Sequence, residues 1–139
     1  IWYIIDFINE CLVKFRVRDN SITAKVNADQ FHFKYDLKKN KIKNFINNKK
    51  VYIWGTGTLA RVVVKNLKKN DLFKNVIGFI DGTLNTYICK RFCGLKVYPK
   101  QVLLTNKINV LVAAEPAIIP CIKFFKLLNY NLGKDYYIF

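Results

Sequence analysis

The residues with the clearest chemical meaning form a glycine-rich turn near the middle of the chain. Gly55, Gly57 and Ala60 stand in the pattern Gly-x-Gly-x-x-Ala, directly after the apolar run 51–54. Residues 59–67 then place apolar side chains at helical spacing, with arginine and lysine on the opposite face. An apolar strand, a glycine turn and a helix in this order are what a nucleotide-phosphate site requires.

Each small residue of the turn has a physical role in such a site. Gly55 makes the turn without a Cβ clash, Gly57 lets the backbone approach a pyrophosphate, and Ala60 lets the helix close on the strand. The free N–H groups and the positive dipole end of the helix then face the phosphate oxygens. No acidic residue lies between Gly55 and Asn70 to repel an anion. The alternative is a tight turn with a purely structural role, because short Gly-x-Gly patterns also occur in ordinary loops.

Asp81 is the second residue that points to nucleotide chemistry. It ends the next apolar run, residues 75–81. It follows the glycine turn at close to the offset at which an acid at the end of the second strand accepts hydrogen bonds from ribose hydroxyls. Alternatively, the carboxylate only caps the loop that begins at Gly82. Both interpretations remain open.

The surroundings of Asp81 predict which nucleotide would bind. Residues 82–85 carry no positive charge, so the 2′-phosphate of NADP would meet a carboxylate at close range. We therefore expect any bound dinucleotide to be NAD rather than NADP, with a UDP-sugar as the alternative occupant. Lys90 or Arg91, on a loop that the sequence does not place, would change this expectation if either folds back toward Asp81.

The elements that position these residues are predicted from residue 50 onward. Continuous apolar runs at 75–81 and 108–114 are typical of parallel strands that helices cover on both faces. Residues 84–93 form a basic loop. Further strands are expected at 94–98 and 135–139, and helices at 99–104 and 117–131. The fold class predicted for 50–139 is therefore α/β, a small Rossmann-like parallel sheet with flanking helices.

A different pattern precedes this unit. Apolar and polar residues alternate around 13–18, 22–26 and 31–35, which predicts a small three-stranded antiparallel β-meander. His32 then falls on the polar face of the third strand, where a solvated side chain is expected. Residues 37–48 follow with a helical pattern, and residues 1–11 fit a helix or a strand equally well. We predict two domains, an N-terminal meander and helix at 1–49 and the Rossmann-like unit at 50–139.

Composition narrows the class of protein. The chain has 139 residues, of which 52% are apolar, and a formal net charge of +15, so it can build a core. The charge suggests an anionic partner, but the lysines are scattered apart from a cluster at 38–50, and no nucleic-acid-binding motif accompanies them. Nucleic acid is therefore not an expected partner. The chain lacks methionine and begins at Ile1, so we expect either a processed piece or an incomplete record of a longer protein.

Cysteine usage and hydropathy point to a soluble cytoplasmic protein. The four cysteines, at 11, 89, 93 and 121, form no Cys-x-x-Cys pair, which favours reduced structural thiols over a metal site. The sequence shows no secretory signal pattern and no apolar run of about 18 residues or more. We therefore expect no transmembrane segment and no metal.

Four segments of the second unit together resemble a known family. Residues 51–60, 78–81, 94–99 and 110–114 are similar, in order, to the Rossmann-like nucleotide-binding domain of bacterial polysaccharide-biosynthesis proteins. Such domains occur in sugar-nucleotide dehydratases and sugar acyltransferases and beside transferase modules. The resemblance covers about two-thirds of the chain. The sequence departs from the family where Gly82-Thr83-Leu84 follows Asp81, and it lacks the catalytic module that accompanies the domain.

The resemblance implies a ligand and a set of binding residues. The ligand would be a nicotinamide dinucleotide such as NAD, or a nucleotide-sugar, with Asp81 near the ribose or the base. The implied binding residues are those of the glycine turn, Asp81 and the end of the run 108–114: Gly55, Thr56, Gly57, Thr58, Leu59, Asp81, Ala113 and Ala114.

Two classes of function remain open. The first is a binding domain for a nucleotide or nucleotide-sugar in bacterial surface-polysaccharide biosynthesis, working with a catalytic module outside this chain and possible as an oligomer. The second is a fragment of an NAD-dependent oxidoreductase or epimerase. A catalytic base for the second would have to be Glu115, with Tyr87 or His32 approaching it, yet Glu115 before proline also reads as a plain loop carboxylate. No pair of acids has a spacing suited to acid–base work, so no catalytic residue is assigned.

Overall fold

Short, uninterrupted apolar runs form the centre of the structure. The computed structural model describes residues 22–84 and 90–139, with side chains from residue 29 onward. In it, β1 (Val51–Trp54) lies between β2 (Val76–Ile80) and β5 (Asn109–Val112) and pairs with both in parallel. All four side chains of β1 are buried, as expected for a strand covered on both faces. The parallel strands predicted in these runs are confirmed.

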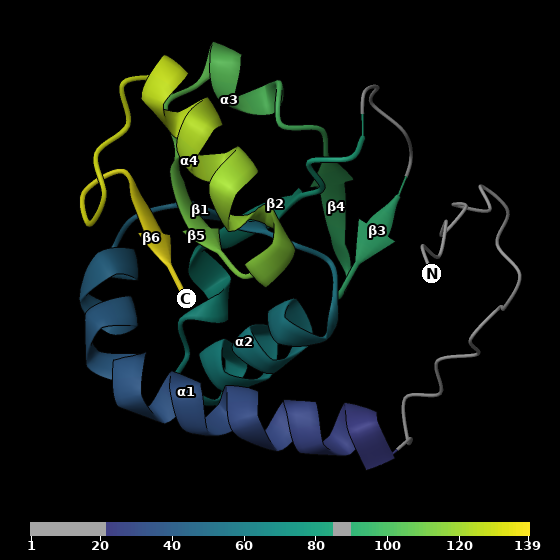
Figure 1. Ribbon diagram of the computed structural model, residues 1–139. Coiled ribbons are helices and arrows are strands. Elements are labelled where there is room, and N and C mark those ends of the chain that lie inside the picture. The colour runs from purple at the N-terminus through teal and green to yellow at the C-terminus, as the bar shows by residue number, and fades with distance from the viewer. Residues whose placement is uncertain (1–21, 85–89) are drawn as a thin grey trace, which may run out of the picture.

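The complete sheet has six strands in the order β3-β4-β2-β1-β5-β6 (Figure 1). β4 (Leu95–Tyr98) continues the parallel pairing beyond β2, and β6 (Tyr136–Ile138) continues it beyond β5. The short β3 (Arg91–Phe92) pairs with β4 in the antiparallel direction. The chain therefore has a mixed α/β fold built on a mostly parallel sheet, as predicted for residues 50–139.

Helices cover the two faces of this sheet. α1 (Ile22–Ile46) and α2 (Thr58–Lys69) lie along the lower side in Figure 1, and α3 (Val102–Thr105) and α4 (Ile118–Leu127) lie on the other side. Two single-turn 3₁₀ helices, η1 (Phe73–Asn75) and η2 (Glu115–Ala117), precede β2 and α4. No helix within the described ranges combines the length and the apolar character needed to cross a membrane.

The alternation of side chains along β1 builds two separate apolar cores. Val51 and Ile53 belong to the core under α1 and α2, whereas Tyr52 and Trp54 belong to the core under α3 and α4. Phe125 anchors the second core, since its ring centroid lies 5.6 Å from that of Trp54 and further rings pack around it. Both faces of β1 are therefore held rigidly, which matters because the glycine turn follows directly.

The predicted β-meander is wrong where the structure describes it. α1 runs continuously through 22–26 and 31–35, the positions of the second and third predicted strands. The first, at 13–18, lies outside the described residues. Tyr35, Ile42, Phe45 and Ile46 are buried at helical spacing against α2 and the sheet, and this burial selects the helix. The helix predicted at 37–48 corresponds to the second half of α1.

The helical conformation also changes the environment of His32. The predicted strand put this side chain in solvent. On α1 it is half-buried, and its Nδ1 lies 3.0 Å from Nδ2 of Asn66 on α2. Asn66 is itself buried and donates a second hydrogen bond to the Val62 carbonyl at 2.8 Å. His32 therefore helps to fasten α1 to α2.

Candidate functional site

Gly55 has a structural reason to be glycine. It follows β1 with φ at +130°, in the region that disfavours side chains. A Cβ at this position would lie 2.5 Å from the Ala113 carbonyl oxygen. The Gly55 N–H donates to the Ile80 carbonyl at 2.9 Å, and the Ala113 N–H donates to the Trp54 carbonyl at 2.8 Å. The turn is therefore clamped between the ends of β2 and β5.

Gly57 is in a different situation. It is the N-cap residue of α2, exposed, with φ at −100°, and a Cβ there would have no atom of the described residues within 4 Å. No side chain in the described part caps this helix, and its first turn holds no acidic residue. The first N–H groups of α2 thus remain available to an anion. Thr58 beside it is exposed, whereas Leu59 is buried in the core.

A cavity of about 360 Å³ opens at the edge of the sheet where the parallel strands end. We call it the edge cavity. Ligand pockets of this kind begin at about 300 Å³. Its lining comes from the ends of β1 and β2, the segments that follow β1, β2, β4 and β5, and the first turn of α4: Trp54, Gly55, Thr56, Ile80, Asp81, Gly82, Thr83, Lys100, Ala114, Pro116, Ala117 and Pro120.

The strand order explains why the edge cavity forms here. The chain runs outward from β1 to β2 and β4, and then crosses back to β5 and β6 on the other side. The connections that leave β1 and β5 therefore diverge, since α2 covers one face and α4 the other. In open parallel sheets, ligands bind at the carboxyl ends of the strands at such a reversal.

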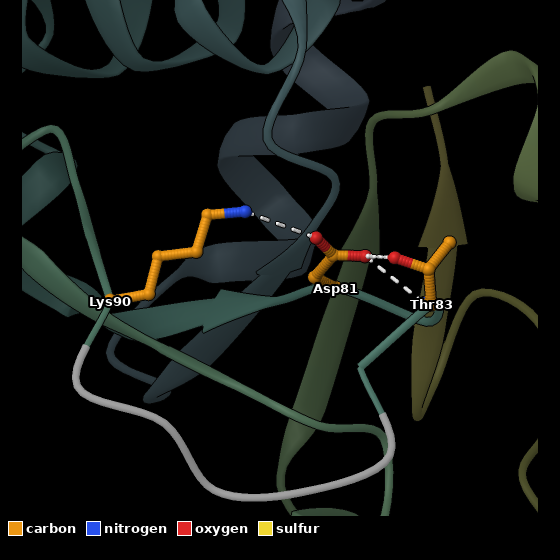
Figure 2. A network of polar contacts seen from close by, with 3 residues as sticks. All are labelled: Asp81, Thr83 and Lys90. Atoms are coloured by element: carbon orange, nitrogen blue, oxygen red, sulfur yellow. Dashed lines mark hydrogen bonds and ion pairs between the residues drawn. The ribbon is translucent and has the colours of Figure 1, made fainter.

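Asp81 lies at this edge with a defined set of partners (Figure 2). Its Oδ1 accepts hydrogen bonds from the Thr83 hydroxyl at 2.7 Å and the Thr83 N–H at 3.0 Å. Its Oδ2 lies 3.4 Å from Nζ of Lys90. The Asp81 N–H donates to the Tyr98 carbonyl at 3.0 Å, which fixes the backbone against β4. Two hydrogen bonds occupy Oδ1, so Oδ2 is the atom with room for a further donor.

These contacts set the charge at Asp81. Burial raises the pKa of this carboxyl. The hydrogen bonds from Thr83 and the ammonium of Lys90 lower the pKa by more than burial raises it, so the pKa lies below the ordinary value. Asp81 is therefore ionised at neutral pH, and Lys90 balances its charge. Because Lys90 folds back to Asp81, the charge argument for NAD over NADP loses its main support.

Gly82 and Trp54 share one corner of the edge cavity. A Cβ at Gly82 would lie 2.9 Å from the indole ring of Trp54. The large side chain at the end of β1 thus requires a glycine after Asp81. This contact accounts for glycine at position 82.

The predicted binding residues are only partly brought together. Gly55, Thr56, Asp81 and Ala114 line the edge cavity. Gly57 and Thr58 are exposed at the start of α2, next to it in sequence. Leu59 and Ala113 are buried in the core and support the turn from beneath.

Sequence reasoning missed several of the other lining residues, among them Lys100, Pro116 and Pro120. Lys100 follows β4, and Pro116 and Pro120 flank the start of α4. They lie on separate connections, and no motif links their spacing to the glycine turn. Only the strand order, which brings the ends of β2, β1 and β5 together, could have indicated them.

The residues considered for catalysis have other partners. Glu115 is exposed, and its Oε1 lies 3.1 Å from Nζ of Lys34 on α1. His32 lies between α1 and α2, and Tyr87 is outside the described residues. Glu115 is not among the residues that line the edge cavity. Within the described ranges, no acid–base pair is assembled at the cavity.

The cysteines and other potential ligands build no metal centre in the part of the chain that is described. No group of three or more His, Cys, Asp or Glu side chains there is placed to hold a metal ion. Cys93 is half-buried and Cys121 is fully buried. Burial raises the pKa of the Cys121 thiol to about 12, so it stays protonated.

Comparison with known proteins identifies no relative. No protein-family model, no curated protein and no solved structure matches the chain.

Proposed function

We propose that the chain is a Rossmann-like domain that binds a nucleotide or nucleotide-sugar in the edge cavity. The observation that carries the proposal is the position of the cavity. It lies where the strand order reverses, between the glycine turn after β1 and the carboxylate after β2. These are the two features that a parallel nucleotide-binding sheet presents to the phosphate and to the ribose.

Each part of the cavity has a chemical role in this proposal. The uncapped N-terminus of α2, beside Thr56, would receive a phosphate. Asp81 would accept a ribose hydroxyl at Oδ2. The apolar lining from Ile80, Pro116 and Pro120 would cover the less polar part of the ligand. A role in bacterial surface-polysaccharide biosynthesis, with a catalytic module outside this chain, follows from the resemblance of the four segments and is part of the same proposal.

The test is a binding measurement with matched variants. We expect NAD, UDP or a UDP-sugar to raise the thermal unfolding midpoint of the wild-type chain, since a ligand at about 100 times its dissociation constant adds about 2.7 kcal/mol of stability. Asp81→Asn removes the proposed ribose contact. Asp71→Asn is the control, because Asp71 also pairs with a lysine, Lys74, but is exposed at the far end of α2.

A second variant separates binding from folding. Gly57→Val should abolish nucleotide binding while the fold persists, because the added side chain points into open space. If none of the nucleotides shifts the midpoint, or if Asp81→Asn and Asp71→Asn bind equally well, the proposed function is wrong.

A further inference from the structure

Lys100 lines the edge cavity and forms no ion pair with a carboxylate of the described residues. The ion pairs of the described residues use other lysines: Lys34 with Glu115, Lys74 with Asp71, Lys90 with Asp81, and Lys107 with Asp135. The described contact of the Lys100 ammonium is with an aromatic ring, since Nζ lies 5.3 Å from the ring centroid of Phe124. Within the part of the chain that the structure describes, a positive charge thus borders the cavity without a carboxylate to pair with it.

The position of Lys100 is fixed by its neighbours. It follows Pro99, which is buried, and its carbonyl accepts the Leu103 N–H at 3.1 Å in the first turn of α3. The side chain is half-buried and is held at its ammonium end by the ring of Phe124 on α4. Because both ends are held, little side-chain entropy remains to be lost when a ligand binds.

The balance of charge at the edge cavity favours an anion. Asp81 and Lys90 neutralise each other at 3.4 Å. Lys100 and the positive dipole end of α2 then remain. Much of the lining is apolar, and a charged hydrogen bond to an anion would offset the hydration that a cation loses beside apolar surface.

We propose that Lys100 binds a phosphate oxygen of the ligand, so that the cavity selects a nucleoside diphosphate, free or as a sugar ester, over the neutral nucleoside. This inference rests on the proposed function and adds the residue that makes the cavity prefer a negatively charged ligand. Lys100 lines the cavity from the β4–α3 connection, whereas Gly55 and Thr56 line it from the turn between β1 and α2. Two anionic groups in one ligand can therefore be contacted from two sides.

The experiment compares UDP with uridine by isothermal titration calorimetry on the wild type and three variants. The variants are Lys100→Gln, the charge-keeping Lys100→Arg and, as control, Lys96→Gln. Lys96 also stands over an aromatic ring, at 5.3 Å from the centroid of Tyr98, but it is exposed and does not line the cavity. We expect Lys100→Gln to weaken UDP binding at least about tenfold, the effect of losing a charge-assisted hydrogen bond, and to leave uridine binding unchanged. Lys100→Arg, which keeps the charge, should retain most of the affinity for UDP.

The outcomes distinguish this inference from the proposed function. If UDP binds the wild type and Lys100→Gln weakens it no more than Lys96→Gln does, the role of Lys100 is refuted and nucleotide binding stands. If Lys100→Gln weakens the binding of UDP and of uridine equally, Lys100 supports the shape of the cavity and does not discriminate between charged and neutral ligands. This result also refutes the inference. If the wild type binds neither UDP, uridine nor NAD, the proposed function fails and this inference fails with it.

Discussion

The two glycines of the turn should differ sharply in what they contribute to folding. In Gly55→Ala, a methyl group must occupy a φ of +130° and lies 2.5 Å from the Ala113 carbonyl oxygen. Backbone strain of this kind costs about 1–3 kcal/mol, and overpacking against a rigid neighbour costs about 1–3 kcal/mol more. We therefore expect Gly55→Ala to lower the free energy of unfolding by about 2–6 kcal/mol, a large part of the roughly 5–15 kcal/mol of a typical domain.

Gly57→Ala is the matched control, since the same methyl group meets open space at a φ of −100°. Alanine is a poorer N-cap residue than glycine, but it also reduces the entropy of the unfolded chain. These effects oppose each other, and the net change should stay within about 1 kcal/mol.

The assay is urea unfolding followed by far-ultraviolet circular dichroism. With a urea slope of about 2 kcal/mol per molar, the midpoint of Gly55→Ala should fall by about 1–3 M, and that of Gly57→Ala should stay close to wild type. Equal midpoints for Gly55→Ala and wild type, or a larger loss for Gly57→Ala, would refute the structural assignment of the two glycines.

Two further predictions concern charge. Lys90→Gln leaves Asp81 without its cation, so the ratio of NADP to NAD dissociation constants should rise relative to wild type; an unchanged ratio would show that Lys90 does not act on the 2′ position. The second is acid sensitivity. Burial raises the pKa of Asp135, but the Asn131 N–H and Lys107 lower it more, and Asp81 is lowered in the same way, so both folded pKa values lie below the ordinary 3.8. The stability that these two carboxylates contribute to the fold is present above pH 3.8 and is lost as the pH falls through their pKa values in the folded state. Between pH 6 and pH 3 the free energy of unfolding should fall by less in Asp135→Asn than in wild type. An identical fall in the two proteins would contradict this prediction.

The glycine turn and its flanking elements could be predicted from the sequence because their signals are local. The run 51–54 is wholly apolar, and α2 has one apolar and one basic face. Such patterns reflect burial on both faces of a strand or one face of a helix, whatever the rest of the chain does. The parallel direction of β1 and β2 followed as well, since a helix must connect them.

The N-terminal half of α1 could not be predicted in this way. Phe31, Phe33 and Tyr35 alternate with polar residues, and this spacing fits a strand over a short window. In the structure Tyr35 is 1% exposed while Phe33 is 66% exposed, a difference that an alternating strand does not allow. The apolar surface of α2 and the sheet selected the helix, and that surface is absent from any local window.

The sequence by itself determined the glycine turn and the acid at the end of the second strand, because the signals for both are local: a glycine pattern after one apolar run and a carboxylate after the next. Only the tertiary structure decided what surrounds them. The strand order carries the β4–α3 connection and η2 to the same edge, which places Lys100 and Pro116 around the cavity that Asp81 also lines. The same arrangement closes Lys90 onto Asp81, nine positions apart along the chain. Contacts of this kind arise from the packing of whole elements, and for that reason no spacing in the sequence predicts them.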